Sequence, residues 1–398
     1  MHPPRLLPAI GLTFAGIALF ATIWTVLPAP TYALWLLSVA ATEWSIYFGL
    51  AGVVAAVLGG AAYRKGARRS GACAMALGVA TFVLSLLPLL SVLPVAERNG
   101  VSLSLPTYFG LANNPNDLAV SKETIPYTVA DGQTLHLDRY WRNGQPAHAM
   151  AKPAVVVVHG GSWSAGSRSD FAQWDRYFAD AGYVVFDIDY RLAPQPNWRT
   201  ATADVQTAVA YVRAQAVPFG VDPDRIALLG RSAGGHLALL AAYTAAPASR
   251  VNAVVSLYGP TDLVWGYHHT AFPDVIDGKG TLQRLTGGTP HTLPDVYREA
   301  SPILHVGPAT VPTLLIHGGR DRIVGPQHSE MLADRLRAEG VPSELVIIPY
   351  ALHGFDYNFE GWGSQVVRTA LMRFLRDAPK CVPVPPPPSG PGTMTNVN

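Results

Sequence analysis

The sequence predicts an α/β protein, with an eight-stranded, mostly parallel sheet covered by helices on both faces and preceded by three transmembrane helices. The first observation is compositional: 49% of the 398 residues are hydrophobic and only 14% are charged, which is too apolar for an ordinary water-soluble enzyme. The second is a change of pattern. After about residue 121, short β-branched runs alternate with longer segments of helical periodicity, as in parallel sheets with crossover helices.

Composition also argues against several functions. The net charge is only +2, from 29 Lys and Arg against 27 Asp and Glu, so we expect no nucleic-acid partner. Two cysteines, Cys73 and Cys381, cannot build a disulfide framework or a four-thiolate metal site. The neighbouring His268 and His269 have no matching Asp, Glu or Cys spacing, so we expect neither a metal nor another cofactor.

The apolar residues concentrate before residue 97, which predicts a membrane anchor over residues 1–96. A span needs about 20 apolar residues, and three stretches qualify: Leu6 to Leu27, Trp44 to Tyr63 and Ala72 to Leu93. The segment Thr31 to Thr42 is too short to cross and return, so it is expected to lie at the interface or to extend the second span at a tilt. Glu43 is expected to be interfacial.

The orientation follows from the basic loop between the second and third spans, which carries Arg64, Lys65, Arg68 and Arg69. Cytoplasmic loops carry the excess of Lys and Arg, which predicts a cytoplasmic N-terminus. Three crossings then place the rest of the chain on the far side, periplasmic or extracellular in a bacterium. A cleaved signal peptide is the alternative for the first span, but two more spans follow it.

The remaining chain is divided into a linker over residues 97–121, a soluble domain over residues 122–379 and a disordered Pro-rich tail over residues 380–398. Two predicted strands, Ile125 to Val129 and Leu135 to Trp141, flank Asp131-Gly132 and form a hairpin. The six later strands are Ala154 to Val158, Tyr183 to Ile188, Ile226 to Leu229, Ala253 to Leu257, Thr313 to Ile316 and Glu344 to Ile348. Helical spacing predicts helices over Phe171 to Ala181, Thr200 to Gln215, Ala233 to Tyr243, Gln327 to Ala338 and Gln365 to Arg376.

A candidate nucleophile lies between a predicted strand and a predicted helix. Gly230-Arg231-Ser232-Ala233-Gly234 joins Ile226 to Leu229 with Ala233 to Tyr243, the context that a nucleophile elbow requires. The glycines permit a very tight turn, which would hold Ser232 at the carboxyl edge of the sheet. A Gly-rich loop without function is the alternative for this short pattern.

Three further motifs supply what a serine nucleophile needs. His159-Gly160-Gly161-Ser162-Trp163 follows a buried strand and can aim backbone N–H groups at a developing oxyanion, together with the N–H of Ala233. His353, just after the last strand, is the candidate base, and Asp321 is the candidate acid with Asp262 as the substitute. His236, inside the helix behind Ser232, is expected to be a packing or hydrogen-bonding residue.

These motifs, with Tyr190-Arg191-Leu192-Ala193-Pro194 and His353-Gly354-Phe355, resemble the α/β-hydrolase esterases of the hormone-sensitive-lipase-like and bacterial feruloyl- and acetyl-xylan-esterase-like group. The resemblance covers roughly Glu123 to Ala378. It implies Ser232 as nucleophile, His353 as base, Asp321 as acid, and the N–H groups of Gly161, Ser162 and Ala233 as the oxyanion hole. The sequence departs from the family in Arg231 before the nucleophile, in Ser162 where a third glycine is usual, and in its three N-terminal spans.

The sequence therefore predicts a membrane-anchored carboxylic-ester hydrolase that acts on short or medium acyl esters, including those of glycans or lipids. An amidase, arylformamidase or peptidase of the same fold is one alternative, a non-catalytic interaction module is another, and spans that carry an acyl donor are a third. The long connection Leu263 to Ser301 is placed where lids are built. Its aromatic residues either line an acyl pocket with Trp163 or bury the lid: Trp265, Tyr267, Phe272 and Tyr297.

Overall fold

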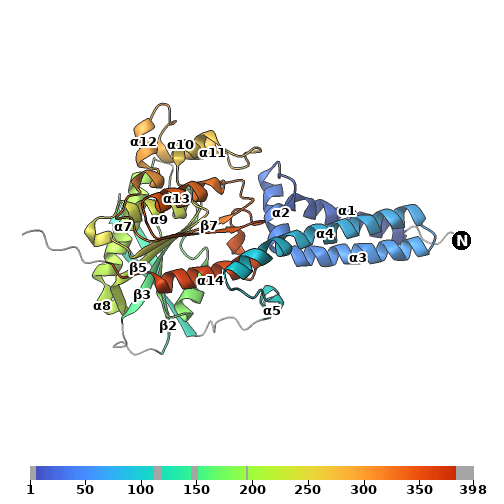
Figure 1. Ribbon diagram of the computed structural model, residues 1–398, viewed down its shortest axis with the longest axis horizontal. Coiled ribbons are helices and arrows are strands. Elements are labelled where there is room, and N and C mark those ends of the chain that lie inside the picture. The colour runs from blue at the N-terminus through green and yellow to red at the C-terminus, as the bar shows by residue number, and fades with distance from the viewer. Residues whose placement is uncertain (1–5, 112–118, 145–150, 194–195, 382–398) are drawn as a thin grey trace, which may run out of the picture.

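The computed structural model describes residues 6–111, 119–144, 151–193 and 196–381. Within these residues, an eight-stranded sheet lies between two layers of helices, and a bundle of long helices projects from one side (Figure 1). We call residues 119–381 the sheet domain and the helices before residue 99 the helical bundle. The strand order is β1-β2-β4-β3-β5-β6-β7-β8, which confirms the predicted fold class.

All eight predicted strands are present: β1 Val120–Ala130, β2 Gln133–Arg142, β3 Lys152–Val158, β4 Val184–Ile188, β5 Val221–Arg231, β6 Ala253–Leu257, β7 Thr313–Gly318 and β8 Ser343–Ile348. β3 to β8 run parallel, whereas β1 and β2 form an antiparallel hairpin that joins the sheet beside β4. The hairpin turns at Asp131-Gly132, where both residues have positive φ. β1 and β5 begin earlier than predicted. In each strand a buried first residue is followed by residues that are exposed or only partly buried, and hydrophobic patterning does not detect such a segment.

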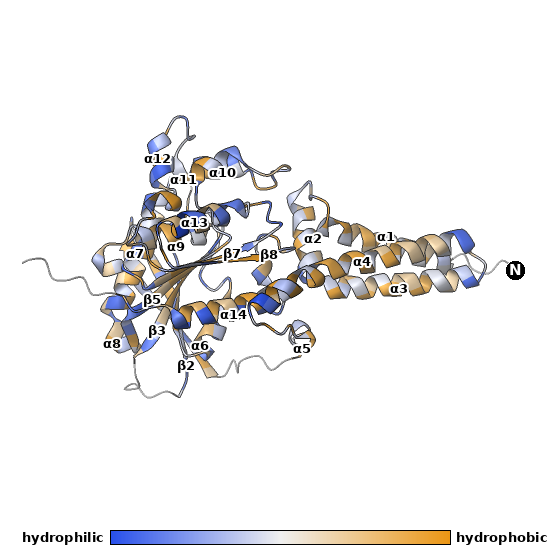
Figure 2. Cartoon of the chain, in the orientation of Figure 1, coloured by the Kyte–Doolittle hydropathy of each residue, from blue (hydrophilic) through white to orange (hydrophobic). Residues whose placement is uncertain are grey.

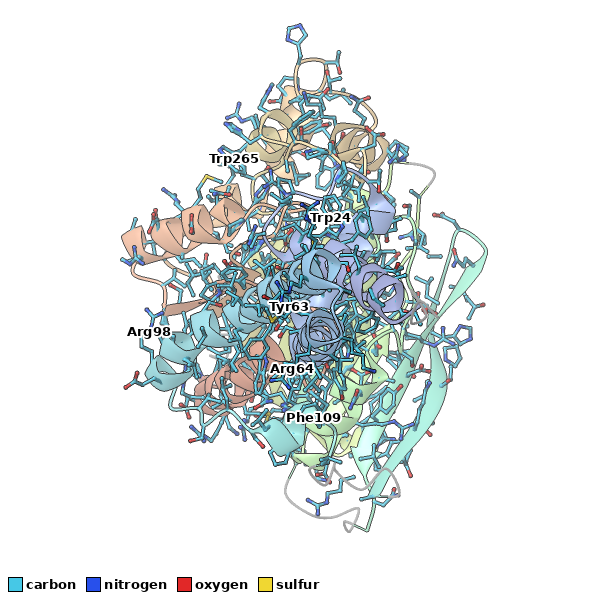
Figure 3. The ribbon with its side chains drawn as sticks, turned by 90° about the vertical axis from the view of Figure 1, so that its right-hand side faces the viewer. Trp24, Tyr63, Arg64, Arg98, Phe109 and Trp265 are labelled. Atoms are coloured by element: carbon cyan, nitrogen blue, oxygen red, sulfur yellow. The ribbon has the colours of Figure 1, made fainter. Side chains whose placement is uncertain are left out.

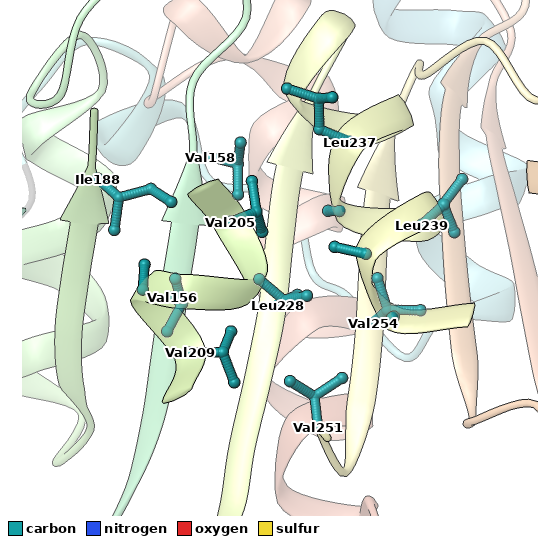
Figure 4. Close-up of a cluster of buried hydrophobic side chains, with 14 of the residues drawn as sticks. Val156, Val158, Ile188, Val205, Val209, Leu228, Leu237, Leu239, Val251 and Val254 are labelled. Atoms are coloured by element: carbon teal, nitrogen blue, oxygen red, sulfur yellow. The ribbon is translucent and has the colours of Figure 1, made fainter. Parts of the chain in front are cut away.

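The helices of the sheet domain are α6 Ala172–Asp180, α7 Trp198–Ala214, α8 Ala216–Phe219, α9 Ala233–Tyr243, α10 Leu263–His268, α11 Gly278–Thr286, α12 Pro294–Glu299, α13 Gln327–Ala338 and α14 Trp362–Asp377. Five of them, α6, α7, α9, α13 and α14, match the predictions closely, whereas α8, α10, α11 and α12 were not predicted. α7, α9 and α13 pack on one face of the sheet, and α6 and α14 pack on the other. Figure 4 shows Val205 and Val209 of α7 against Val156 of β3 and Leu228 of β5. Strands covered on both faces are apolar throughout their covered part, as β3 is from Ala154 to Val158.

The helical bundle contains α1 Leu6–Thr22, the 3₁₀ turn η1 Ile23–Thr25, α2 Tyr32–Glu43, α3 Ser45–Arg64 and α4 Arg68–Arg98. Among the described residues, three helices are long and apolar enough to cross a membrane, at Pro8–Thr25, Ser45–Arg64 and Arg68–Arg98. Figure 2 shows the apolar colour running along α1, α3 and α4. Their outward side chains are exposed, including Phe14, Ile17, Phe20, Leu50, Val53, Val57, Val79, Phe82 and Val83. An apolar surface of this extent is unfavourable in water.

α3 and α4 approach each other through glycines. A Cβ atom on Gly59 would lie 2.5 Å from the backbone nitrogen of Met75, and a Cβ on Gly78 would lie 2.5 Å from that of Ala56. Real Cβ atoms do not come so close, so the two backbones are in contact only because these positions lack side chains. Small residues at helix contacts are typical of membrane helices, whose association depends on close van der Waals packing.

Replacing Gly59 with valine is therefore expected to destabilise the helical bundle by about 1–3 kcal/mol, the usual cost of overpacking. The next residue provides a matched control, since a Cβ on Gly60 would meet no atom within 4 Å. Thermal denaturation of the full chain in one detergent would compare Gly59→Val with Gly60→Val. Equal midpoints for the two variants would contradict the close packing of α3 on α4.

α4 extends well beyond the predicted third span. It has 31 residues, and Val92, Val95 and Ala96 in its last turns are buried in the core beside α14. The helix thus continues past the boundary predicted at residue 97, to Arg98, and its last turns pack against the sheet domain. The expected linker also contains the short helix α5 Leu105–Tyr108, while residues 112–118 lie outside the described part, as do residues 382–398 of the expected tail.

Glu43, which was expected to be interfacial, is covered by the sheet domain and is only 5% exposed. Its backbone carbonyl accepts hydrogen bonds from the Tyr108 hydroxyl at 3.0 Å and from the Asn358 amide at 2.8 Å. Burial, with the nearby Asp356, raises the pKa of its carboxyl group well above the ordinary value. The end of α2 is thus attached to the sheet domain rather than exposed to solvent.

Candidate active site

Ser232 lies in a strained turn between β5 and α9. Its φ of 54° and ψ of −121° place a residue with a side chain in a region that non-glycine residues seldom adopt. Its backbone N–H donates to the carbonyl of Leu257 at 2.9 Å, which ties the turn to the end of β6. The turn presents the Ser232 hydroxyl at the carboxyl edge of the sheet.

The motif needs glycine at positions 230 and 234, because a side chain at either position would clash with the backbone. A Cβ on Gly230 would lie 2.1 Å from the carbonyl oxygen of Gly234, and a Cβ on Gly234 would lie 2.2 Å from that of Val158. Both contacts involve backbone atoms, which cannot move aside. The predicted elbow is therefore present, and the explanation that Gly230 and Gly234 permit a tight turn is consistent with the structure.

The structure brings Ser232, His353 and Asp321 together in one hydrogen-bonded chain. His353 Nε2 lies 2.8 Å from Ser232 Oγ, and His353 Nδ1 lies 2.6 Å from Asp321 Oδ2. Nδ1 faces a carboxylate and so carries the proton, which leaves Nε2 as the acceptor for the serine hydroxyl. This arrangement can remove a proton from Ser232.

Asp321 is held in place from several sides. Its Oδ1 accepts the backbone N–H groups of Ile323 at 2.8 Å and Val324 at 3.0 Å. Burial alone would raise its pKa, but the imidazoles of His353 and His317 outweigh burial and bring the pKa well below its ordinary value. The group therefore stays ionised at neutral pH. His317, with Nε2 at 3.4 Å from Asp321, was missed by sequence reasoning, since a histidine inside a strand gives no signal of its own.

The alternatives considered for the acid and base have other roles. Asp262 caps α10, where its Oδ1 accepts the N–H of Trp265 at 2.9 Å. His236 is fully buried, with Nε2 at 2.7 Å from the carbonyl of Ala300 and Nδ1 accepting from the Trp163 indole at 3.2 Å. Burial lowers the pKa of His236 to about 4, so it is a neutral hydrogen-bonding residue, as expected.

The loop after β3 lies directly beside the nucleophile. A Cβ on Gly160 would be 3.3 Å from Ser232 Cβ. Gly161, Ser162 and Trp163 all have positive φ, of 112°, 53° and 59°, a run of left-handed backbone that is rare for residues with side chains. Among the described residues, no backbone acceptor binds the N–H groups of Gly161 and Ser162, and Ala233 begins α9, where the first N–H groups have no helical partner.

The Tyr190-Arg191 motif holds this loop in its conformation. The Tyr190 ring stacks on His159 at 4.4 Å, and its hydroxyl donates to the His159 carbonyl at 3.2 Å. The Trp163 carbonyl accepts the N–H of Ala193 at 2.9 Å and the amide of Asn197 at 3.2 Å. Pro194 lies outside the described residues. The described part of the motif thus acts on the loop, not on the nucleophile.

Two cavities meet at Ser232. The lid-side cavity, of about 500 Å³, lies beneath α10 and α11 and is lined by Ser162, Trp163, Ser232, Ala233, Leu263, Trp265 and Leu282, among others. The α2-side cavity, of about 360 Å³, is lined by Tyr32, Trp35, Gly161, Ser162, Ser232, Tyr258 and His353, among others. All three predicted oxyanion residues therefore border one or both cavities.

The lid aromatics divide between the two expected roles. Trp163 and Trp265 line the lid-side cavity, and Trp265 stacks on His269 with ring centroids 4.4 Å apart. Tyr297 is fully buried and packs edge-on against Tyr267 within the lid, and both residues pack into the hydrophobic core of the sheet domain. Phe272 is 88% exposed. Of the four lid aromatics, only Trp265 lines the pocket.

Arg231, which departs from the family pattern, is buried beneath the site. Its Nε donates to Asp356 at 2.6 Å, and its guanidinium lies over the Phe171 ring at 4.1 Å. The Tyr258 hydroxyl donates to the other oxygen of Asp356, and the Tyr258 ring lies 4.6 Å from that of His353. A buried charge needs a partner, and Asp356 supplies it.

Comparisons with known proteins agree with this geometry. The profile of the BD-FAE family matches residues 143–336. Esterase LipC of Mycobacterium tuberculosis is 36% identical over 238 residues, which is 55% of this chain and 57% of that protein. The probable carboxylic ester hydrolase LipM of the same organism is 31% identical over 241 residues, which is 56% of this chain and 54% of that protein. The chain thus matches little more than half the length of these relatives.

The fold of this chain is also similar to that of a solved esterase structure. The esterase Est2 of Thermogutta terrifontis, with propionate bound, has a TM-score of 0.54 and 26% identity, and the match covers 68% of this chain and all of that chain. Together with the sheet topology, these similarities confirm the α/β-hydrolase fold and the predicted resemblance to esterases.

Proposed function

We propose that this α/β-hydrolase, with a BD-FAE match over residues 143–336, is a membrane-anchored serine hydrolase of carboxylic esters. The observation that carries the proposal is the hydrogen-bonded chain from Ser232 through His353 to Asp321 at the meeting point of two cavities. The similarity to LipC, LipM and Est2, which are named as esterases or ester hydrolases, favours esters over amides.

The reaction would proceed through an acyl-enzyme. Ser232 Oγ attacks the ester carbonyl carbon while His353 Nε2 takes its proton, and the N–H groups of Gly161, Ser162 and Ala233 bind the oxyanion. The C–O bond to the alcohol breaks, and His353 returns the proton to the leaving oxygen. Water then attacks the acyl-enzyme with His353 again as base, which releases the acid and restores Ser232.

The acyl group would occupy the lid-side cavity beside Trp163 and Trp265. Its volume of about 500 Å³ accommodates short and medium chains. The propionate bound to Est2 belongs to the same size range. We propose short or medium acyl esters on this basis.

The anchor would be formed by α1, α3 and α4. The exposed apolar side chains of these helices and the exposed Arg64, Lys65, Arg68 and Arg69 at the end far from the sheet domain support a cytoplasmic N-terminus and an extracytoplasmic sheet domain. Figure 3 views the bundle along its helices, with Tyr63 and Arg64 near the centre. α3 has 20 residues, which span about 30 Å, the thickness of a hydrocarbon core.

A fluorophosphonate probe that does not cross membranes would test both parts of the proposal in cells that express the full chain. We expect the probe to label the wild type in intact cells and to leave Ser232→Ala unlabelled, because the phosphorus atom bonds to the activated serine oxygen. Labelling only after permeabilisation would contradict the orientation and retain the chemistry. Equal labelling of Ser232→Ala, or no labelling of the wild type under either condition, would contradict the assignment of Ser232.

A further inference from the structure

The two cavities at Ser232 differ in one respect that matters for chemistry. His353 lines the α2-side cavity and is absent from the lining of the lid-side cavity. In the mechanism above, His353 returns a proton to the leaving oxygen, so the alcohol of the ester must lie on the side of His353. The alcohol therefore belongs in the α2-side cavity, and the acyl group belongs on the other side of Ser232.

One wall of the α2-side cavity comes from the helical bundle. Tyr32 and Trp35 on the first turn of α2 line it together with Ser232 and His353. Their rings stack on each other with centroids 5.2 Å apart. A helix that belongs to the membrane anchor by sequence thus contributes directly to the site of reaction.

Hydrogen bonds attach α2 to the sheet domain at two places, in the segment that precedes the helix and at the last residue of the helix. The Arg320 guanidinium donates to the carbonyls of Thr25 and Val26, just before α2, and Arg320 is the neighbour of Asp321. At the other end, Tyr108 and Asn358 both donate to the carbonyl of Glu43. These contacts fix Tyr32 and Trp35 relative to His353, so the wall is a stable part of the cavity.

The same helix lies where the bundle meets the sheet domain (Figure 1). Exposed aromatic and apolar side chains lie on α2 and at the start of α3: Tyr32 is 51% exposed, Leu36 49%, Trp44 39% and Tyr47 46%. Tyrosine and tryptophan concentrate at the boundary between hydrocarbon and headgroups. Trp44 and Tyr47 lie at the start of α3, which puts this boundary beside α2 and the α2-side cavity.

We propose that the alcohol part of the substrate is a membrane lipid, and that Tyr32 and Trp35 bind it as it rises from the bilayer into the α2-side cavity. The inference rests on the proposed ester hydrolysis and names its substrate class: a short acyl group esterified to the polar end of a lipid. The hydrocarbon of such a lipid stays in the bilayer, the ester reaches Ser232, and the released alcohol returns to the membrane. Tyr32 and Trp35 determine specificity for the alcohol, whereas the acyl group contacts the lid-side cavity.

Two butyryl esters that differ only in the alcohol would test this assignment, with the full chain reconstituted in dioleoyl-phosphatidylcholine vesicles. One is nitrophenyl butyrate in solution, and the other is dioleoyl-butyryl-glycerol in the same bilayer, with butyrate release as the readout. For Trp35→Ala, we expect the ratio of kcat/KM on the bilayer ester to that on the soluble ester to fall about ten-fold. Tyr32→Ala should lower the ratio in the same direction. Fluorophosphonate labelling counts the active sites, so that loss of folded protein does not enter the ratio.

Leu36→Ala is the matched control, because Leu36 is the exposed neighbour of Trp35 on α2 and does not line the cavity. We expect its ratio to stay that of the wild type. An unchanged ratio in Trp35→Ala, or an equal fall in Leu36→Ala, would overturn the inference, since the latter would reflect membrane contact alone. A wild type that cleaves only the soluble ester would also overturn it while leaving the proposed function intact, whereas cleavage of neither ester would contradict both.

Discussion

Replacing Asp321 with asparagine is expected to lower kcat for ester hydrolysis by about 10⁴-fold, with a smaller change in KM. The carboxylate accepts the Nδ1 proton of His353 at 2.6 Å, which leaves Nε2 free to take the proton of Ser232. An asparagine amide can instead donate to Nδ1 and favour the tautomer with the proton on Nε2. That tautomer cannot act as a base, although the geometry of the site is retained. Steady-state kinetics on a soluble butyryl ester would measure the effect.

Asp262→Asn is the control for this experiment, since Asp262 was the other candidate acid. It caps α10 by accepting the N–H of Trp265, and asparagine caps helices about as well as aspartate. We expect kcat of Asp262→Asn to remain within about three-fold of the wild type. A loss in Asp262→Asn as large as that in Asp321→Asn would contradict the assignment of the acid.

Replacing Arg231 with methionine is expected to destabilise the sheet domain by about 3–5 kcal/mol, the cost of leaving one buried partner of an ion pair uncompensated. The Arg231 and Asp356 side chains are 2% and 0% exposed, respectively, and lie 2.6 Å apart. Without the guanidinium, the Asp356 carboxylate keeps the Tyr258 hydroxyl and loses its counter-charge. For a domain of this size, the apparent melting temperature should fall on the order of 10 °C, measured in one detergent.

Two further variants separate the buried pair from the general effect of losing an arginine. Arg337→Met breaks an exposed ion pair with Asp334, whose side chains are 73% and 74% exposed, and should change the melting temperature very little. The double variant Arg231→Met/Asp356→Leu removes both charges and should recover part of the loss. A melting temperature for Arg231→Met equal to that of Arg337→Met would contradict the role of the buried pair.

The residues of the proposed catalytic triad were the most predictable from sequence. Ser232 and His353 lie next to strand ends within short motifs, and a tight strand-to-helix turn needs glycines at fixed spacing, so local sequence carries the signal. The sheet was predictable for a similar reason, since Val155 to Val158 can only belong to a strand that is covered on both faces.

The contacts between distant segments were not predictable in the same way. Tyr32 and Trp35 belong to the segment Thr31 to Thr42, which was expected to lie at the membrane interface or to extend the second span. Nothing in the local sequence indicates that they line a cavity with His353, more than 300 residues away. The ion-pair partner of Arg231 could not be predicted either, because the sequence around a single arginine does not show which carboxylate it contacts in the folded chain. Periodicity identifies which face of an element is buried, but it does not identify the element that covers it.

α4 passes from the helical bundle into the core of the sheet domain without a break. In the proposed orientation, a flexible tether would let the sheet domain change its distance from the membrane, whereas this continuous buried helix would hold Ser232 at a constant height over the bilayer. The proposed enzyme would then meet a lipid ester by lateral diffusion in two dimensions. Its turnover would then follow the surface density of ester in its own membrane, and the volume of the surrounding compartment would have no influence on it.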